Sequence, residues 1–267
     1  MSQLALTLSD GAVVAKRNLI KIKRIPELLI WTTLSPIMFV LLFGYVFGSS
    51  IEIPGTDYRE YLIAGVFAQT VIFGATGTGA GVAEDMTKGI IDRFRSLPMA
   101  RSAVLVGRTT SDILYNTISI TVMAITGLIV GWRIRTSVLE AAGGFLLLLL
   151  FAYAISWIMA YIGLKVPSVE VVQNASFMFI MPVTFISNSF VRLDFLPGPL
   201  QTFAEWNPVS SVAQAAREAF GNTGALPEPE VWSLDNPIAY SLIWIGIILA
   251  IFVPLSIRHY NKATTAS

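Results

Sequence analysis

The sequence contains no cysteine and only one histidine, His259. Disulfides and thiolate metal sites are therefore excluded, and a single histidine cannot form a histidine cluster. Charged residues make up only 13% of the chain, and the net charge is +1. A protein that binds phosphate backbones carries a clear basic excess, so nucleic acid is not an expected partner. The sequence offers no catalytic constellation and no metal site, and we do not expect an enzyme.

Apolar residues, by contrast, make up 54% of the 267 residues. Apolar surface on this scale needs lipid to cover it. A helix that crosses the hydrocarbon core needs about 20 predominantly apolar residues. Six such runs are present, at about 28–48, 61–83, 103–132, 141–164, 171–191 and 237–257. We therefore expect an all-α membrane protein with six transmembrane helices. The start of the third is the least defined, because Arg108 and Asp112 interrupt it.

The distribution of lysine and arginine predicts how the six spans are oriented. Basic residues in short loops favour the cytoplasmic side. The segments between the spans form two alternating groups, one with thirteen basic residues and the other with five. Because the larger group includes both ends of the chain, we expect both termini in the cytoplasm. Residues 1–24 lack a signal-peptide cleavage pattern, so the first span is expected to be retained.

Two segments outside the spans have helical patterns. Residues 4–25 combine apolar residues with a basic cluster, which predicts an amphipathic helix in the cytoplasmic interface. The long segment 192–236 contains five prolines, yet 209–220 has helical spacing. One face of that helix holds Val212, Ala216 and Phe220, and the other holds Gln214, Arg217 and Glu218. We expect a re-entrant-like helix on the extracytoplasmic side. No repeat is apparent, so residues 1–267 are treated as one domain.

A glycine-rich run lies in the second predicted span. A phosphate-binding loop needs Gly-x-x-x-x-Gly-Lys-Ser/Thr after a strand, and that pattern is absent from the sequence. Small residues within a span let helices approach closely. We interpret the run as a helix-packing surface, formed by Gly74, Gly77, Gly79 and Gly81.

The cytoplasmic segment 84–108 is the most informative of the loops. Its apolar residues recur at helical spacing until Pro98, which predicts a short amphipathic helix. An apolar knob flanked by guanidinium groups suits a groove on a partner protein. A helix that rests on the membrane, with its arginines facing lipid phosphate, accounts for the same residues. The pattern alone leaves both interpretations open.

At this segment the chain resembles the permeases of ABC-2 type exporters, in particular the daunorubicin-resistance (DrrB-like) branch. The resemblance covers nearly the whole chain. The first matching patch consists of Glu84, Gly89, Arg93, Arg95, Ser96, Leu97, Pro98, Arg101, Gly107 and Arg108. The second consists of Asn207, Pro208 and Arg217, after Pro182 and Phe190.

The resemblance implies a transport subunit in the cell (plasma or inner) membrane, without bound cofactor. In such exporters the loop forms a coupling helix that docks on a separate ATPase subunit, which binds ATP and Mg. Two ATPase chains join two permease chains, either a homodimer or a pair of paralogues. The implied cargo is a hydrophobic drug, a lipid or a related metabolite. The implied ATPase contacts are Glu84, Asp85, Arg93, Phe94, Arg95, Leu97, Pro98 and Arg101.

Polar side chains within the second and fifth spans are candidates for a substrate path. They are Gln69, Thr76, Thr78, Asn174, Ser187 and Asn188. Buried polar groups in membranes usually face the interior of a bundle. Hydrogen bonds to neighbouring helices are the favoured interpretation, and a substrate path is the other.

Two other functions are alternatives to drug or lipid export. One is the polysaccharide-export branch of the same superfamily, which the Arg95 to Pro98 run disfavours. The other is an ATP-independent carrier or membrane scaffold. Secondary carriers generally need coupling-ion sites at the midplane and often have inverted repeats, and the sequence shows neither.

Overall fold

The computed structural model describes residues 34, 36–47, 51, 53–90, 103–166, 168–190, 192–225 and 230–263. Over these ranges the chain is nearly all helical, and the only extended pairing is an isolated bridge between Ile53 and Thr56. The all-α prediction is confirmed for this part of the chain. The predicted interfacial helix over 4–25 lies outside the described residues. So do six of the predicted ATPase contacts, namely Arg93, Phe94, Arg95, Leu97, Pro98 and Arg101.

Four of the described helices are long and apolar enough to cross a membrane. They are α3 (Tyr58–Thr87), α5 (Ala103–Val130), α6 (Val138–Lys165) and α11 (Pro237–Ala263). They correspond to the second, third, fourth and sixth predicted spans. Since α5 begins at Ala103, Arg108 and Asp112 lie inside it.

The remaining helices are shorter. Two are apolar and fall on the first and fifth predicted spans. They are Pro36–Val46, which overlaps the π-helical segment η1 (Leu42–Phe47), and α7 (Val169–Phe185). Four follow in the long segment before α11, namely η2 (Leu193–Phe195), α8 (Gly198–Glu205), α9 (Pro208–Phe220) and α10 (Trp232–Asp235). The helix predicted over 209–220 is therefore present as α9.

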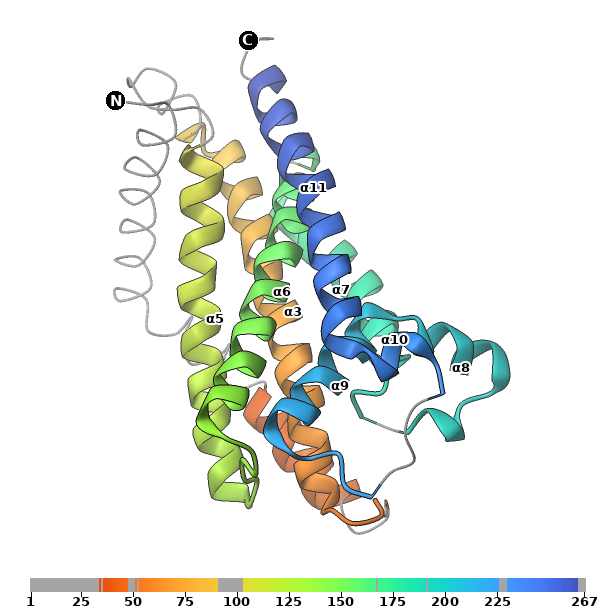
Figure 1. The fold of residues 1–267 in the computed structure, drawn as a ribbon. Helices are drawn as coiled ribbons and strands as arrows, with labels where there is room; N and C mark the ends of the chain where they lie inside the picture. Colours follow the sequence, from red (N-terminus) through yellow and green to blue (C-terminus); the bar gives the residue numbers. More distant parts are fainter. Residues whose placement is uncertain are drawn as a thin grey trace.

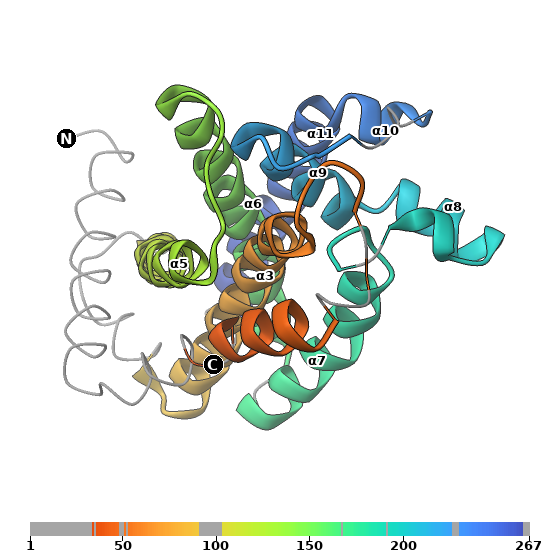
Figure 2. The ribbon, with the colours of Figure 1, turned by 90° about the horizontal axis from the view of Figure 1, so that it is seen from below.

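Helix α3 lies at the centre of the bundle, surrounded by η1, α5, α6, α7 and α9 (Figure 2). Its glycines allow this close packing. A side chain at Gly163 of α6 would overlap the Gly79 carbonyl, and a Cβ at Gly79 would lie 2.8 Å from the Met159 carbonyl oxygen. The backbones of α3 and α6 are in contact there, which confirms that Gly79 serves helix packing.

The two ends of the bundle serve as reference points for the site. α3 ends, α5 begins and α11 ends at one end of the bundle, which we call the Glu84 end (Figure 1). α3 begins and α5 ends at the opposite end, which we call the Glu60 end.

Helix α7 ends at Phe185, six residues before the predicted end of the fifth span. The side chain of Asn207 explains this boundary. Its Nδ2 donates to the carbonyls of Val183 and Ile186, at 2.7 and 2.8 Å, which satisfies the end of α7. Its Oδ1 accepts from Val209 N at 2.9 Å, which caps the start of α9. One amide thus fixes the junction of both helices.

Candidate functional site

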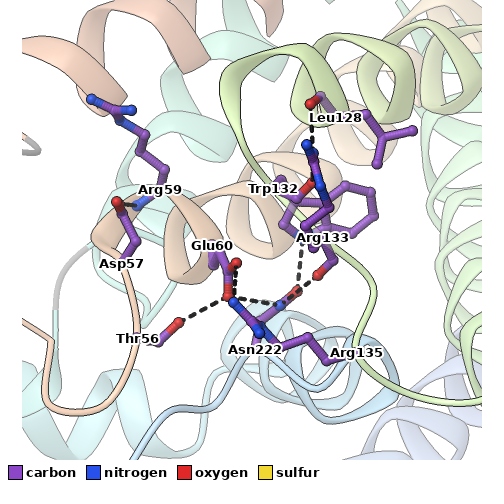
Figure 3. A network of polar contacts seen from close by, with 9 residues as sticks. All are labelled: Thr56, Asp57, Arg59, Glu60, Leu128, Trp132, Arg133, Arg135 and Asn222. Atoms are coloured by element: carbon purple, nitrogen blue, oxygen red, sulfur yellow. Dashed lines mark hydrogen bonds and ion pairs between the residues drawn. The ribbon is translucent and has the colours of Figure 1, made fainter.

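The Glu60 end of α3 holds a network of polar side chains (Figure 3). Asp57 caps α3 by accepting from Arg59 N at 2.8 Å, and the helix then places Glu60 toward the bundle. Arg135 donates to both oxygens of Glu60, at 2.8 and 2.9 Å. The Glu60 side chain is 6% exposed and that of Arg135 is 61% exposed. The hydrogen bond to Glu60 raises the pKa of Arg135. This bidentate pair links α3 to the loop between α5 and α6.

Asn222 joins a third segment to the same network. It follows α9, whose last turn ends at Gly221 in the left-handed conformation, with φ +70°. Its Oδ1 accepts from the indole of the fully buried Trp132 at 2.6 Å, and its Nδ2 donates to the Arg133 carbonyl at 2.9 Å. Three segments distant in sequence therefore meet at Glu60.

Arg217 is the most deeply buried charged residue of this region, with 0% exposure. Its Nε donates to the Tyr61 carbonyl at 3.0 Å. Its Nη2 donates to the carbonyls of Asn188 and, at 3.2 Å, Ser189. The guanidinium carbon lies 3.6 Å from the centre of the Tyr61 ring. Burial lowers the pKa of Arg217, yet an arginine remains protonated in proteins. A permanent cation thus ties α9 to α3 and to the turn after α7.

That turn packs closely against α3. The hydroxyls of Tyr58 and Tyr61 donate to the carbonyls of Phe190 and Asn188, at 2.9 and 3.1 Å. A side chain at Gly65 would overlap the backbone of Ser189. Glycine is required at position 65 for this approach.

A cavity of about 550 Å³ opens beside Arg217. Tyr61, Leu193, Val231 and Leu234 supply its apolar contacts. Its polar lining consists of Asn188, Arg192, Asp194, Gln201, Glu205, Gln214, Arg217, Glu218, Thr223 and Glu230. A cavity of this size, with mixed walls, has room for a small amphipathic molecule.

Two of the predicted ATPase contacts are described, at the Glu84 end of α3. Glu84 forms an ion pair with Lys88, at 2.6 Å, and this hydrogen bond raises the pKa of Lys88. The side chains of Lys88 and Glu84 are 61% and 30% exposed. Asp85, one residue further along α3, is buried with 9% exposure. Glu84 is therefore partly exposed in the last turn of α3, whereas Asp85 is turned inward.

The candidate substrate-path residues do not gather in one place. Ser187 and Asn188 are buried in the turn after α7, and Asn188 lines the cavity. Asn174 is exposed on α7. On α3, Gln69 is buried, Thr76 donates to its own helix at Phe73, and Thr78 donates to Asp112 of α5.

Sequence reasoning missed most of the Glu60 network and misplaced Arg217. The helical pattern of α9 assigned Arg217 to the face opposite Ala216, but both residues are buried. Position 217 is four residues after the buried Ala213 and three before the buried Phe220, so its spacing already matched the inner face. No local pattern connects Glu60, Arg135 and Asn222, because they belong to segments far apart in the chain.

Most of the chain is similar to known transporter permeases. The ABC-2 type transporter family matches residues 11–220. The chain is 32% identical to the daunorubicin resistance ABC transporter permease protein DrrB1 of Streptomyces coeruleorubidus, over 92% of this chain and 84% of that protein. It is 25% identical to a probable doxorubicin resistance ABC transporter permease protein, DrrC, of Mycobacterium tuberculosis, over 86% and 80%. It is 24% identical to a putative transport permease of Cyanophora paradoxa, over 84% and 78%.

A bundle of apolar helices with a buried polar centre, matched over most of its length by transporter permeases, identifies the chain as a member of the ABC-2 type transporter family.

Proposed function

We propose that this chain is the permease subunit of an ATP-driven exporter and that a separate ATPase docks on residues 84–101. The observation that carries the proposal is the similarity to ABC transporter permeases over 92% of the chain. The Glu84 end of α3 supports it, because the half-buried Glu84 and the exposed Lys88 precede the segment with the other predicted contacts. The assembly we propose holds two such permeases and two ATPase chains.

The proposed topology has six spans, with both termini in the cytoplasm of the cell that carries the protein. Four spans are the long apolar helices. Helix α7 has 17 residues, which at about 1.5 Å per residue gives roughly 26 Å, close to the thickness of a bilayer core. The remaining span is the predicted 28–48, of which the structure describes the apolar helix Pro36–Val46. In this topology the Glu84 end is cytoplasmic and the Glu60 end faces outward.

The proposed cargo is a hydrophobic drug, a lipid or a related metabolite. Two of the relatives are named for resistance to daunorubicin and doxorubicin. Among the candidate path residues, Asn188 lines the cavity at the outward end. We propose that the cargo passes this cavity as it leaves the bundle.

The test is co-purification from mild detergent with the ATPase encoded beside this protein. The unsubstituted chain is expected to retain the ATPase. Glu84→Ala, and Arg93→Ala combined with Arg95→Ala, are expected to lose it while remaining in the membrane. Asp235→Ala is the matched control, because Asp235 is an exposed carboxylate of α10, far from the Glu84 end. If no ATPase associates under any condition, the exporter proposal is wrong and an ATP-independent carrier or scaffold takes its place.

A further inference from the structure

Polar residues of α5 meet glycines and a threonine of α3 in a regular series, which we call the α3–α5 ladder. The facing positions are Gly81 with Arg108, Thr78 with Asp112, and Gly74 with Asn116. Successive positions of the ladder are three or four residues apart on α3 and four apart on α5. This spacing places them on one face of each helix. Because the two helices run in opposite directions, the numbers rise on one as they fall on the other.

Hydrogen bonds connect the two helices at the first two steps of the ladder. Arg108 Nη2 donates to the Gly77 carbonyl at 3.0 Å. Thr78 Oγ1 donates to the Asp112 carboxylate. Arg108 also attracts that carboxylate from one turn away on α5. The charges of α5 are therefore directed toward the centre of the bundle.

Steric fit fixes the remaining contacts. A side chain at Gly81 would overlap the Arg108 guanidinium, and one at Gly74 would overlap the Asn116 amide. Asn116 and Thr78 are both fully buried, and Asn116 Nδ2 donates to the Asp112 carbonyl at 3.0 Å. A one-turn slip of α5 along α3 would break both inter-helix hydrogen bonds and push these side chains against backbone. In lipid, polar groups without partners are costly.

The ladder lies at the Glu84 half of both helices, next to the segment that joins them. α3 ends at Thr87 and α5 begins at Ala103. We propose that Arg108, Asp112, Thr78 and Asn116 are positioning residues that hold α3 and α5 in one register. The joining segment then meets the ATPase between two fixed ends. The inference rests on the proposed function, which supplies the ATPase.

The same helix connects this region to the outward network. Glu60 is 21 residues before Gly81 on α3, which corresponds to about 32 Å along the helix axis. If α3 and α5 move as one body, a displacement at the joining segment reaches the Glu60 network through α3 alone. A loose hairpin would absorb that displacement between its two helices.

The absence of native cysteine makes a distance measurement direct. Thr87→Cys on α3 and Thr110→Cys on α5, both exposed positions, would carry two spin labels in the full chain in lipid nanodiscs. With the ladder intact, we expect a narrow distance distribution that ATP and Mg do not change when the ATPase is present. In Thr78→Val and in Asp112→Leu we expect a broader distribution. Thr117→Val is the control, because that exposed threonine donates only to its own helix, at Ile113, at 2.8 Å.

Permease-dependent ATP hydrolysis provides a readout that a packing role would not move. A hydrogen bond between membrane helices has a typical strength equivalent to about a threefold change in an equilibrium. Thr78→Val is expected to lower hydrolysis by about that factor while co-purification with the ATPase stays unchanged. The exchange of Thr78→Asp with Asp112→Thr restores the pair and is expected to restore hydrolysis. If Asp112→Leu does not fold, Asp112→Asn is the variant to measure. It keeps an acceptor oxygen for Thr78 and is expected to behave like the unsubstituted chain.

The outcomes separate the two proposals. An unchanged distance distribution in both Thr78→Val and Asp112→Leu would overturn the ladder, and so would an exchange that leaves hydrolysis low. Failure of the unsubstituted chain to bind the ATPase would contradict the proposed function instead. The distances measured in the permease alone would then still decide the ladder.

Discussion

Replacement of Arg217 by methionine is the most direct test of how α9 is held against α3 and the turn after α7. The substitution keeps an unbranched side chain of similar length but removes the guanidinium. The Ser189 carbonyl then loses its only described charged donor, and the stacked contact with the Tyr61 ring is lost. The Asn188 carbonyl keeps the Tyr61 hydroxyl as a donor, at 3.1 Å. The damage is therefore concentrated at the turn after α7.

The expected cost follows from these contacts. A hydrogen bond to a charged group contributes about 1.5–3 kcal/mol, and a desolvated cation–π contact about 2 kcal/mol. Relief of the guanidinium from burial offsets part of this sum. We expect a net loss of about 2–4 kcal/mol in the free energy of unfolding, which at about 2–4 °C per kcal/mol lowers Tm by roughly 4–16 °C. Arg217→Lys keeps the charge but not the planar guanidinium group. Its Tm is expected to lie between that of Arg217→Met and that of the unsubstituted protein.

Intrinsic fluorescence during heating is a suitable assay, because Trp132 reports from the same end of the bundle through its bond to Asn222. The measurement compares purified variants in one detergent. Arg258→Ala is the control, since Arg258 is exposed on α11, and its Tm should change little. A Tm for Arg217→Met within 2 °C of the unsubstituted protein would refute the assignment of Arg217 as the tie between α9, α3 and the turn.

Three further predictions concern pH, the cavity and helix packing. Partial burial raises the pKa of Glu218 above its usual 4.5, although the hydrogen bond from Gln214 opposes the shift. The stabilising contribution of Glu218 is present below the unfolded pKa and is lost as pH rises through the folded pKa. Glu218→Gln should therefore make Tm less dependent on pH between these two pKa values. On the proposed function, Thr223→Trp fills part of the cavity and should lower the efflux of a hydrophobic drug probe several-fold without loss of the proposed ATPase. Leu242→Trp, at an exposed position of α11, should leave that efflux unchanged. Gly163→Leu should prevent folding or lower Tm more than Gly143→Leu, because Gly163 touches the Gly79 carbonyl and Gly143 has open space around its Cα.

Composition and hydropathy predicted the long helices well, since a span needs little more than length and apolar content. The third predicted span was placed at 103–132 despite its charges, and α5 indeed begins at Ala103. The fifth span was predicted to reach 191 but α7 stops at Phe185, because the Asn207 side chain satisfies the carbonyls at its end. A cap supplied from 21 residues away lies outside the reach of a hydropathy window.

In the site, too, some residues could be predicted from the sequence and others could not. Thr78 is buried and donates a hydrogen bond to Asp112 of the neighbouring helix, which is the kind of contact that hydropathy and polarity alone can suggest. Arg217 was placed on the wrong face, because an arginine is rarely buried without a carboxylate partner. Here main-chain carbonyls and an aromatic ring stand in for the carboxylate. Such partners are created only when the turn after α7 folds against α3.

The order of burial among the four long helices explains why α3 carries both the Glu60 network and its side of the α3–α5 ladder. α3 has the lowest mean hydropathy of the four and is the most enclosed, because 78% of its most apolar stretch is buried. α11 is the most hydropathic and has only 22% buried. A helix in contact with lipid must be apolar on its exposed faces, whereas a helix surrounded by protein can hold polar groups that its neighbours satisfy. Glu60, Thr78 and the glycines of α3 are therefore tolerated because five other elements enclose it, and that enclosure makes α3 the element through which the two ends of the bundle can influence each other.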